Sequence, residues 1–308
     1  MKLVDVTLRE SVYTDLNIDY EQALIFIQEF TNAINPEICE YIEIGYIDSQ
    51  DSQKPLQRYH GKYIHKAKQI VGNRFKLSAM LHIESFLPEQ WEEENIKQLS
   101  MVRIVVNGEY DENIKDVIQY FHSHSILVSV NCAYISRRSK KDMIEMYEKA
   151  IQAGVDIFYI ADTNGSTMPY DIGEIMKLLN KKNQEIKLGI HTHNHFEMAT
   201  ANAVIANQYG VTYIDSTMCG YGKGAGNLKT ELSILLFSKI QKQVLSKMQI
   251  QKLFQLIQFF QEQILFQKQE LYEKRFLNQL YAYRNKTLNE IKQIEQKSDL
   301  ATIQKLLS

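Results

Sequence analysis

The stretch Lys187-Leu188-Gly189-Ile190-His191-Thr192-His193-Asn194-His195 joins a short apolar run to three histidines at alternate positions. The apolar part predicts a buried strand, and successive side chains of a strand point to opposite faces. His191 and His193 are therefore expected on the same side of the strand, about 7 Å apart. Two neutral imidazoles suit a divalent metal, but two ligands rarely hold one, so an oxygen ligand must come from elsewhere in the chain.

Short β-rich runs of this kind alternate with helical patterns from residue 1 to about residue 230. The eight predicted strands are Leu3–Thr7, Tyr41–Gly45, Phe75–Leu81, Val102–Val106, Ile126–Val130, Ile157–Ala161, Ile186–Ile190 and Val211–Asp215. Because such alternation is typical of βα units, it predicts an α/β fold of the (β/α)8 type, a TIM barrel. A doubly wound open sheet is the lesser alternative, and no phosphate-binding glycine fingerprint follows the first strand.

Residues 1–235 are predicted to form the catalytic barrel, and residues 236–308 a helical C-terminal extension. The chain contains neither Gly nor Pro from Leu228 to Ser308. Apolar residues recur in this segment at three- and four-residue steps, at Ile250, Leu253, Ile257, Phe260 and Ile264. One helix face is therefore apolar, and we expect it to pack on the barrel, on a second copy of the chain, or on both.

Composition excludes several classes of partner. The 308-residue chain has 44% apolar residues, 23% charged residues and a formal net charge of -2. These values favour neither nucleic acid nor a membrane as a partner, and no apolar run is long enough to span a bilayer. The N-terminus enters a strand pattern without an apolar signal segment, and the three cysteines form no Cys-x-x-Cys pair. We therefore expect a cytoplasmic protein without a disulfide framework.

Residues that follow different strands of a TIM barrel meet at one face. The candidate metal ligands at this face are Glu10 after the first strand, His191 and His193 after the seventh, and Asn227 in the glycine-rich loop after the eighth. Three or four such ligands would leave positions open for a bidentate substrate or for water. Arg9, next to Glu10, would lie over any anion bound there.

Four segments resemble the metal-dependent pyruvate aldolase, carboxyltransferase and lyase superfamily, the hydroxymethylglutaryl-CoA lyase-like or DRE-TIM metallolyases. They are Asp5–Glu10, Ala161–Gly165, Gly189–Asn194 and Gly222–Asn227 with Thr230-Glu231 behind it. This superfamily includes 4-hydroxy-2-oxovalerate aldolase, isopropylmalate and homocitrate synthases, and hydroxymethylglutaryl-CoA lyase. The pattern is most similar to that of 4-hydroxy-2-oxovalerate aldolase.

The resemblance implies a divalent-metal-dependent lyase that makes or breaks a carbon–carbon bond adjacent to a 2-oxo acid, through a metal-bound enolate of the pyruvate type. Glu10, His191 and His193 would bind the metal, and Asn227 would complete or approach the ligand set. Mn²⁺ or Mg²⁺ is expected, and Zn²⁺, Co²⁺ and Fe²⁺ stay open. Arg9 would contact the keto oxygen of the substrate and stabilise the enolate.

The acid/base residue departs from the family pattern. The segment Ser11–Tyr13 follows Arg9 and Glu10, and the oxovalerate aldolases carry a histidine at the place of Tyr13. A tyrosine transfers protons only with a lowered pKa or through a relay. Tyr13 and His195 are therefore both candidate catalytic residues, and His82 is an alternative to His195 in this role.

Substrate contacts are also expected from residues near strand ends and in the glycine-rich loop. Apart from Arg9, the candidates are Asn131, Thr163, Asn164 and Gly224. Thr163 and Asn164 are assigned equally to loop structure and to substrate contact, because their neighbours favour turns. Strand alternation alone leaves open whether Asn131 and Glu43 face the core or the mouth of the barrel.

Two other functions stay open. An acetyl-CoA-dependent condensing enzyme of the isopropylmalate or homocitrate synthase type is mildly favoured by Glu10 in place of the commoner Asp. A catalytically lapsed barrel with a scaffolding role is suggested by Ser11 and Tyr13, although the retained ligand set argues against it. The expected partners are a small-molecule 2-oxo acid with an aldehyde or an acyl-CoA, and a second copy of the chain in a homodimer formed through the C-terminal helices.

Overall fold

The computed structural model describes residues 1–49, 53–108, 113–182 and 186–265. Eight strands form a closed parallel barrel in which each strand pairs with the next and the last pairs with the first. They are β1 (Lys2–Asp5), β2 (Cys39–Tyr46), β3 (Lys76–His82), β4 (Met101–Val106), β5 (Leu127–Cys132), β6 (Ile157–Asp162), β7 (Lys187–Thr192) and β8 (Tyr213–Ser216). The prediction of a TIM barrel is confirmed.

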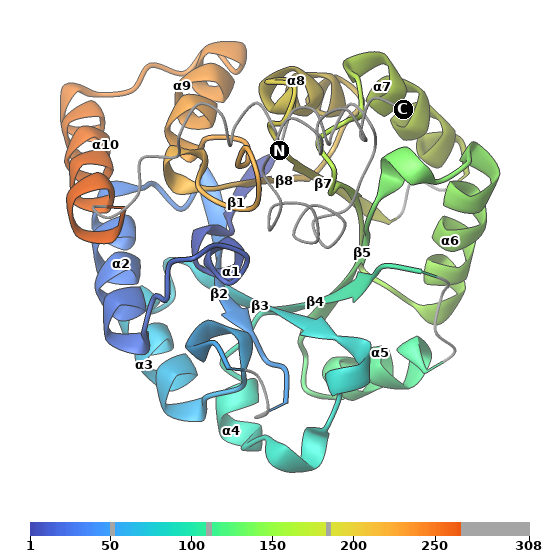
Figure 1. Cartoon of the computed structure of the whole chain (residues 1–308), viewed down its shortest axis with the longest axis horizontal. Coiled ribbons are helices and arrows are strands. Elements are labelled where there is room, and N and C mark those ends of the chain that lie inside the picture. Colours follow the sequence, from blue (N-terminus) through green and yellow to red (C-terminus); the bar gives the residue numbers. More distant parts are fainter. Residues whose placement is uncertain (50–52, 109–112, 183–185, 266–308) are drawn as a thin grey trace, which may run out of the picture.

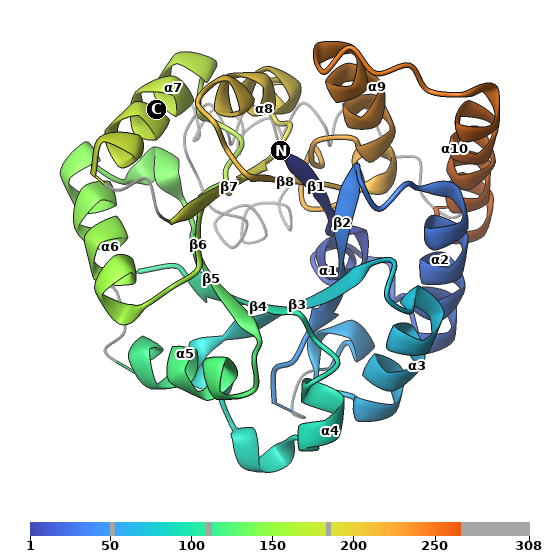
Figure 2. The ribbon, with the colours of Figure 1, turned by 180° about the vertical axis from the view of Figure 1, so that it is seen from behind.

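Helices surround the barrel, as Figure 1 shows down its axis and Figure 2 shows from behind. The α-helices are α1 (Thr7–Ser11), α2 (Tyr20–Ala33), α3 (Gly61–Val71), α4 (Glu93–Ile96), α5 (Ile114–Ser123), α6 (Lys140–Ala153), α7 (Pro169–Lys182), α8 (Ala199–Gln208), α9 (Thr230–Ile240) and α10 (Lys247–Phe259). Short 3-10 turns are η1 (Pro55–Gln57), η2 (Ile83–Ser85), η3 (Pro88–Gln90), η4 (Ile135–Arg137) and η5 (Met218–Gly220), and a π-helical turn, η6 (Phe260–Ile264), follows α10. Capping boxes at Asp19 and Ser139 fix where α2 and α6 begin.

The first strand is shorter than predicted. It ends at Asp5, whose carboxylate accepts hydrogen bonds from the Thr7 amide (3.2 Å) and the Thr7 hydroxyl (2.9 Å). This local contact turns the chain out of the strand, so α1 begins at Thr7. Arg9 and Glu10 therefore lie on a single helical turn and not at the end of an extended strand.

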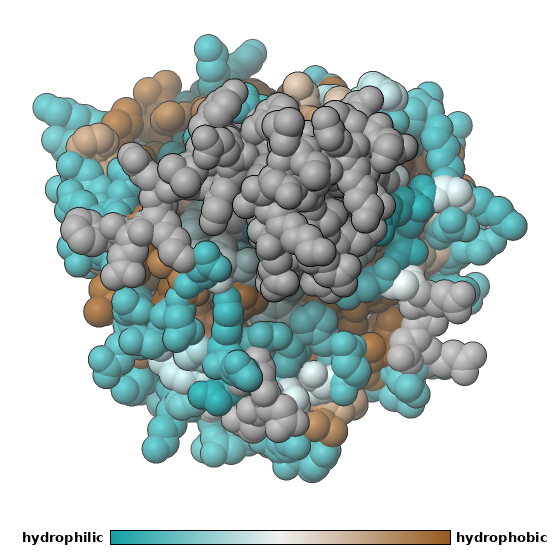
Figure 3. All heavy atoms as spheres, in the orientation of Figure 1, coloured by the Kyte–Doolittle hydropathy of each residue, from teal (hydrophilic) through white to brown (hydrophobic). Residues whose placement is uncertain are grey.

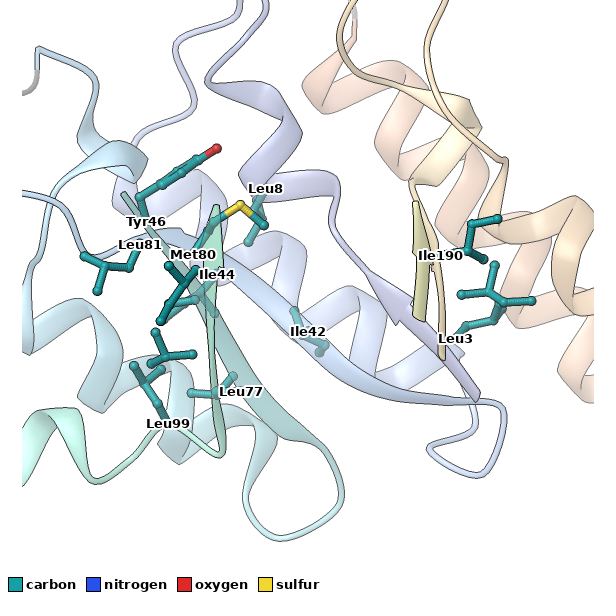
Figure 4. Packing of buried hydrophobic residues seen from close by; sticks show 14 of the residues in the cluster. Leu3, Leu8, Ile42, Ile44, Tyr46, Leu77, Met80, Leu81, Leu99 and Ile190 are labelled. Carbon is teal, nitrogen blue, oxygen red and sulfur yellow. The ribbon is translucent and has the colours of Figure 1, made fainter. Parts of the chain in front are cut away.

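Strand alternation divides the core into two layers. Outward residues such as Leu3, Ile42 and Ile190 belong to the large cluster between the strands and the helices, part of which Figure 4 shows. Inward residues form a second cluster inside the barrel, made of Val4, Val6, Tyr41, Met101, Ile157, Tyr159 and Tyr213. The residues of both clusters are buried, so the barrel interior is a packed core.

A buried polar layer occupies inward positions two residues beyond the inner apolar cluster. Glu43 follows Tyr41 on β2, Arg103 follows Met101 on β4, and Asp215 follows Tyr213 on β8, at the same two-residue step. Because strands alternate with a period of two, these charged residues share the inward face of the cluster below them. Strand alternation in the sequence left open which way Glu43 points, and the structure shows that it faces the barrel interior.

The C-terminal helices pack on the outside of the barrel. Leu253, Phe260 and Ile264 are buried as predicted, whereas Ile250 is 49% exposed. The ring of Phe260 lies 5.6 Å from that of Phe26 on α2, so the apolar face covers α2. Most of the predicted extension, residues 266–308, lies outside the described residues, and the domain division and the homodimer stay predictions. Within the described ranges, no helix combines the length and apolar character that crossing a membrane requires.

Candidate active site

Three side chains that are distant in sequence converge at the mouth of the barrel. Glu10 on α1, His191 in β7 and His193 just after β7 are buried, and one ligand atom from each lies within 4.8 Å of the others. The Nε2 atom of His191 is 3.2 Å from Nε2 of His193 and 3.6 Å from Oε1 of Glu10. A carboxylate and two imidazoles in this arrangement could hold one metal ion.

The glycine-rich loop folds back along the end of β7 and brings Asn227 beside this cluster. His193 and Asn227 form an antiparallel backbone bridge, and the Asn194 amide donates to the Gly226 carbonyl at 2.8 Å. The Asn227 side chain is buried, and its Nδ2 donates to the Tyr221 carbonyl at 3.1 Å. Its Oδ1 has no hydrogen-bond partner among the described residues, so an oxygen ligand is left unpaired next to the cluster.

Gly222 lets the loop approach Glu10. It has a φ of 149°, and a Cβ atom at this position would overlap the Asn227 amide nitrogen and crowd the Glu10 carboxylate. The next residue, Lys223, donates its backbone N–H to Oε2 of Glu10 at 3.2 Å. The backbone of the glycine-rich loop thereby holds the Glu10 carboxylate in place.

The imidazole ring of His191 is oriented by Asp215 on β8. Oδ2 of Asp215 lies 3.1 Å from Nδ1 of His191. A carboxylate that accepts the Nδ1 proton leaves the Nε2 lone pair facing the cluster, as in many carboxylate–histidine–metal sites. The donor set therefore fits a divalent metal, and the unpaired Asn227 oxygen fits a fourth ligand.

The charges around the cluster also fit a cation. The Arg9 guanidinium contacts Glu10 and donates through Nε to Glu43 at 2.8 Å. Arg103 donates to Glu43 at 3.2 Å and to Asp215 at 2.7 Å. Three buried carboxylates thus face two buried guanidinium groups, which gives this network a formal charge of -1. A divalent cation would bring the formal charge to +1, and a singly charged anionic ligand on that cation would bring it to zero, so the network suits a cation together with an anion.

The environment shifts the pKa values of Glu10 and His193 towards the forms that bind metal. Burial raises the pKa of Glu10, but Arg9 and the two histidines outweigh burial and hold it well below its usual range. Burial lowers the pKa of His193 well below the usual value for histidine. At neutral pH the cluster therefore offers an ionised carboxylate and a neutral His193 imidazole, as metal binding requires.

His195 lies next to the cluster in a tight slot. Its ring is 5.9 Å from that of His193, and Cβ atoms added to Gly165 and Gly224 would overlap its two ring nitrogens. Burial, with a smaller effect from Lys223, lowers the pKa of His195 to about 4, and its Nδ1 has no hydrogen-bond partner among the described residues. A neutral imidazole therefore lies where the sequence predicted a proton-transfer residue.

Tyr13 is hydrogen-bonded to a residue that the sequence did not indicate. Its hydroxyl contacts the hydroxyl of Tyr46, at the end of β2. Although 37% of Tyr13 is exposed, desolvation of its hydroxyl raises the pKa of Tyr13 to about 12, so the phenol is neutral at pH 7 and its environment does not provide the lowered pKa that a base requires. The Tyr46 ring stacks on His82, and Nδ1 of His82 lies 2.7 Å from Oδ2 of Asp48. Tyr46 is thus the available relay partner, and the catalytic role of Tyr13 stays a prediction.

The other predicted substrate-binding residues lie at strand ends, but some already have structural partners. The Thr163 hydroxyl accepts from the Tyr134 amide at 3.0 Å, which supports the loop interpretation of this residue. Asn131 faces the barrel interior and accepts from the Ser129 hydroxyl at 2.9 Å. Asn164 is buried after β6. Their contacts with substrate stay predictions.

Sequence reasoning missed Arg103 and Asp215. Arg103 stands in the apolar run Met101–Val106, and Asp215 stands at the end of the run that became β8. A charged residue inside a buried strand is expected to have a buried partner of opposite charge. The presence of one basic and one acidic residue in two buried strands could therefore have indicated that Arg103 and Asp215 form an ion pair.

The fold and the cluster together define the class of protein, a TIM barrel with a candidate metal centre at its mouth. Residues 100–260 match the HMGL-like family, and the chain belongs to this family, whose members are enzymes. A crystal structure of the N-terminal domain of a candidate aldolase from Bacteroides vulgatus superposes with a TM-score of 0.80, covering 99% of both chains at 20% identity. That comparison confirms the fold.

Curated relatives include both lyases and synthases. The chain is 25% identical to the oxaloacetate decarboxylase of Mycobacterium tuberculosis over 236 residues, which are 74% of this chain and 67% of that protein. It is 32% identical to the 2-isopropylmalate synthase of Methanocaldococcus jannaschii over 145 residues, 46% of this chain and 27% of the synthase. It is 32% identical to the 4-hydroxy-2-oxovalerate aldolase of Geobacillus thermodenitrificans over 102 residues, 33% of this chain and 30% of the aldolase. The matched part therefore spans less than a third of the synthase and of the aldolase.

Proposed function

We propose that the chain is a divalent-metal-dependent lyase of the 4-hydroxy-2-oxovalerate aldolase type. It would make or break a carbon–carbon bond adjacent to a 2-oxo acid, with pyruvate or its enolate as one partner. The observation that carries this proposal is the convergence of Glu10, His191 and His193 beside Arg9. Two relatives support it, since the names oxaloacetate decarboxylase and 4-hydroxy-2-oxovalerate aldolase both specify a 2-oxo acid.

The chain supplies fixed charge where an enolate would form. A bound divalent cation would polarise the keto oxygen of a 2-oxo acid. Arg9 is buried and its guanidinium is oriented by Glu10 and Glu43, so its positive charge is in place before an oxyanion develops. Asn227 is proposed as a fourth ligand because its Oδ1 is unpaired.

Exchange of pyruvate methyl protons with deuterium tests this proposal directly, because exchange requires an enolate. In the presence of Mg²⁺, proton NMR should show exchange with the wild-type chain. His191→Ala should abolish the exchange, and Arg9→Ala should slow it about 10²–10³-fold, as expected for the loss of an oxyanion-stabilising donor. His65→Ala and Arg74→Ala, at exposed positions, are the matched controls and should exchange at the wild-type rate.

The same assay separates the two acid/base candidates. Tyr13→Phe removes a hydroxyl, and His195→Gln removes an imidazole while keeping a polar side chain of similar size. The variant that loses exchange but still binds Mg²⁺ identifies the residue that moves the proton. Metal binding by the wild-type chain without exchange of any 2-oxo acid would contradict the lyase proposal and favour a scaffolding role.

A second candidate is a condensing enzyme that uses acetyl-CoA. It is favoured by the 32% identity to a 2-isopropylmalate synthase over 145 residues. Release of free CoA from acetyl-CoA, dependent on a 2-oxo acid and measured with a thiol reagent, would support it. Condensation of pyruvate with aldehydes, without release of CoA, would support the aldolase.

A further inference from the structure

Arg103 lies inside the barrel, away from the mouth. It is the third residue of β4 and is completely buried. Its guanidinium reaches Asp215 on β8, which stands opposite β4 in the closed eight-stranded barrel, so the side chain crosses the interior. A charge this deeply buried is tolerated only with good partners.

Two carboxylates and one aromatic ring hold this guanidinium. Arg103 donates to Oε1 of Glu43 at 3.2 Å and to Oδ2 of Asp215 at 2.7 Å. Its Cζ atom lies 4.2 Å from the centre of the Tyr159 ring. The Tyr159 ring in turn lies so close to Gly189 on β7 that a Cβ atom there would overlap it.

Each of the two carboxylates also contacts a residue of the candidate active site. The second oxygen of Glu43, Oε2, accepts from Nε of Arg9 at 2.8 Å. Oδ2 of Asp215 lies 3.1 Å from Nδ1 of His191. Arg103 therefore connects Glu43, which binds Arg9, with Asp215, which binds His191, and it does so at shorter range than Arg9, whose Nη2 lies 3.8 Å from Oδ2 of Asp215.

We propose that Arg103 is a positioning residue for the reaction, which acts through Glu43 and Asp215 to orient Arg9 and His191. It touches neither the ligand cluster nor the mouth. A planar guanidinium can bind two carboxylates at once in fixed directions, whereas an ammonium group is a point charge without such geometry. The geometry of Arg103, and not only its charge, is therefore required.

The role proposed for Arg103 rests on the proposed function, but the experiments that test it do not require catalytic turnover. Arg103→Lys keeps the positive charge and removes the planar guanidinium group that donates to two carboxylates. The double variant Arg103→Met/Glu43→Gln removes one charge of each sign, which keeps the charge balance if the lysine variant fails to fold. Leu77→Ala, at a buried apolar position on β3, is the control for a loss of stability without a change in the network.

The first measurement is the tautomer of His191 in metal-free protein labelled with ¹⁵N-histidine, assigned by the loss of its signals in His191→Gln. Wild-type protein and Leu77→Ala should show one tautomer, protonated at Nδ1, because Asp215 is held in place. Arg103→Lys and the double variant should show a mixture of both tautomers. The second measurement is the Mn²⁺ dissociation constant by electron paramagnetic resonance, which should rise at least about tenfold in both variants and remain unchanged in Leu77→Ala.

A single unchanged tautomer, or a wild-type dissociation constant, in the folded variants would overturn the proposal. Absence of pyruvate exchange in the wild-type chain would instead contradict the lyase function. The tautomer measurement would still decide the role of Arg103 in that case, because it requires neither metal nor substrate.

Discussion

Gly224 and His195 illustrate how the mouth of the barrel depends on the absence of a side chain. His195 is buried between the loop after β6, at Gly165, and the loop after β8, at Gly224. Gly224 has a φ of 64°, a conformation that residues with a side chain rarely adopt. The glycine-rich loop, which the sequence assigned to substrate binding, therefore also holds a candidate proton-transfer residue in place.

Replacing Gly224 by alanine should destabilise the protein for two separable reasons. Alanine at positive φ costs about 1–2 kcal/mol, and the new Cβ atom would overlap the confined His195 ring. Gly154→Ala is the matched control, because Gly154 is also left-handed, with φ 88° and ψ 27°, and nothing lies near its added Cβ atom. Urea unfolding should show the larger loss of unfolding free energy in Gly224→Ala, and equal losses would mean that the His195 ring moves freely.

At the scale of elements, the contact between the C-terminal helices and α2 depends on Phe260. This residue is completely buried, and its ring packs against Phe26 on α2 and against Tyr221 of the glycine-rich loop. The C-terminal helices are thereby joined to the loop that closes over Glu10. We therefore expect that loosening the C-terminal helices also loosens the glycine-rich loop at the mouth of the barrel.

Phe260→Ala should lower the free energy of unfolding by about 3–5 kcal/mol, because it removes a large ring from a packed core. Phe254→Ala, on α10 with 59% of its surface exposed, should change it by less than about 0.5 kcal/mol. Denaturant unfolding of both variants tests the difference. Similar values for the two would show that the C-terminal helices do not pack on α2 in solution.

The contact between Asp48 and His82 joins the loop after β2 to the end of β3, and its strength should depend on pH. Burial lowers the pKa of His82, but the hydrogen bond and charge of Asp48 outweigh burial and raise it above 6.5. A raised pKa means that the folded state binds the proton more tightly than the unfolded state. The resulting stabilisation is fully present below pH 6.5 and is lost as the pH rises through the pKa of the folded state.

The difference in unfolding free energy between wild-type protein and His82→Gln should therefore be larger at pH 6 than at pH 9. Glutamine can still donate a hydrogen bond to Asp48 but cannot become charged. His65→Gln, which removes an exposed histidine outside this contact, is the control. A difference that does not vary with pH would show that His82 is not protonated in the folded state.

For the whole molecule, the candidate ligand cluster of Glu10, His191 and His193 predicts that a divalent cation stabilises the barrel. A ligand that binds only the folded state at 100 times its dissociation constant adds about 2.7 kcal/mol to the free energy of unfolding. Calorimetry should show a melting temperature that rises with the Mn²⁺ concentration and falls again with EDTA. Glu10→Gln should remove most of this dependence, and an unchanged melting temperature at saturating Mn²⁺ would contradict the metal site.

The surface carries a hydrophobic region over α9 and α10, at the upper left of Figure 3, among mostly hydrophilic residues. The large exposed apolar side chains of these two helices include Leu232 and Leu235 on α9 and Met248 and Phe254 on α10. The homodimer through the C-terminal helices stays a prediction. Sedimentation velocity of charged variants at these positions would test it.

Much of the site could be predicted from the sequence because its residues follow strands. Glu10, His191 and His193 were predicted as candidate ligands from their positions after predicted strands, together with the resemblance, and the structure brings them close together. The partners Tyr46 and Asp215 were not found. Their roles depend on which strands face each other and at what height, and local periodicity carries no information about either.

The sequence by itself determined the eight strands, the helices between them and the side chains that could bind a metal, because these follow from patterns within a few neighbouring residues. Only the tertiary structure decided that Glu43 faces inward, that the glycine-rich loop closes over Glu10, and that Arg103 reaches Asp215, 112 positions away in the chain. The physical reason is that closing a barrel fixes the tilt and register of all strands together, so contacts across its interior exist only once the last strand has paired with the first.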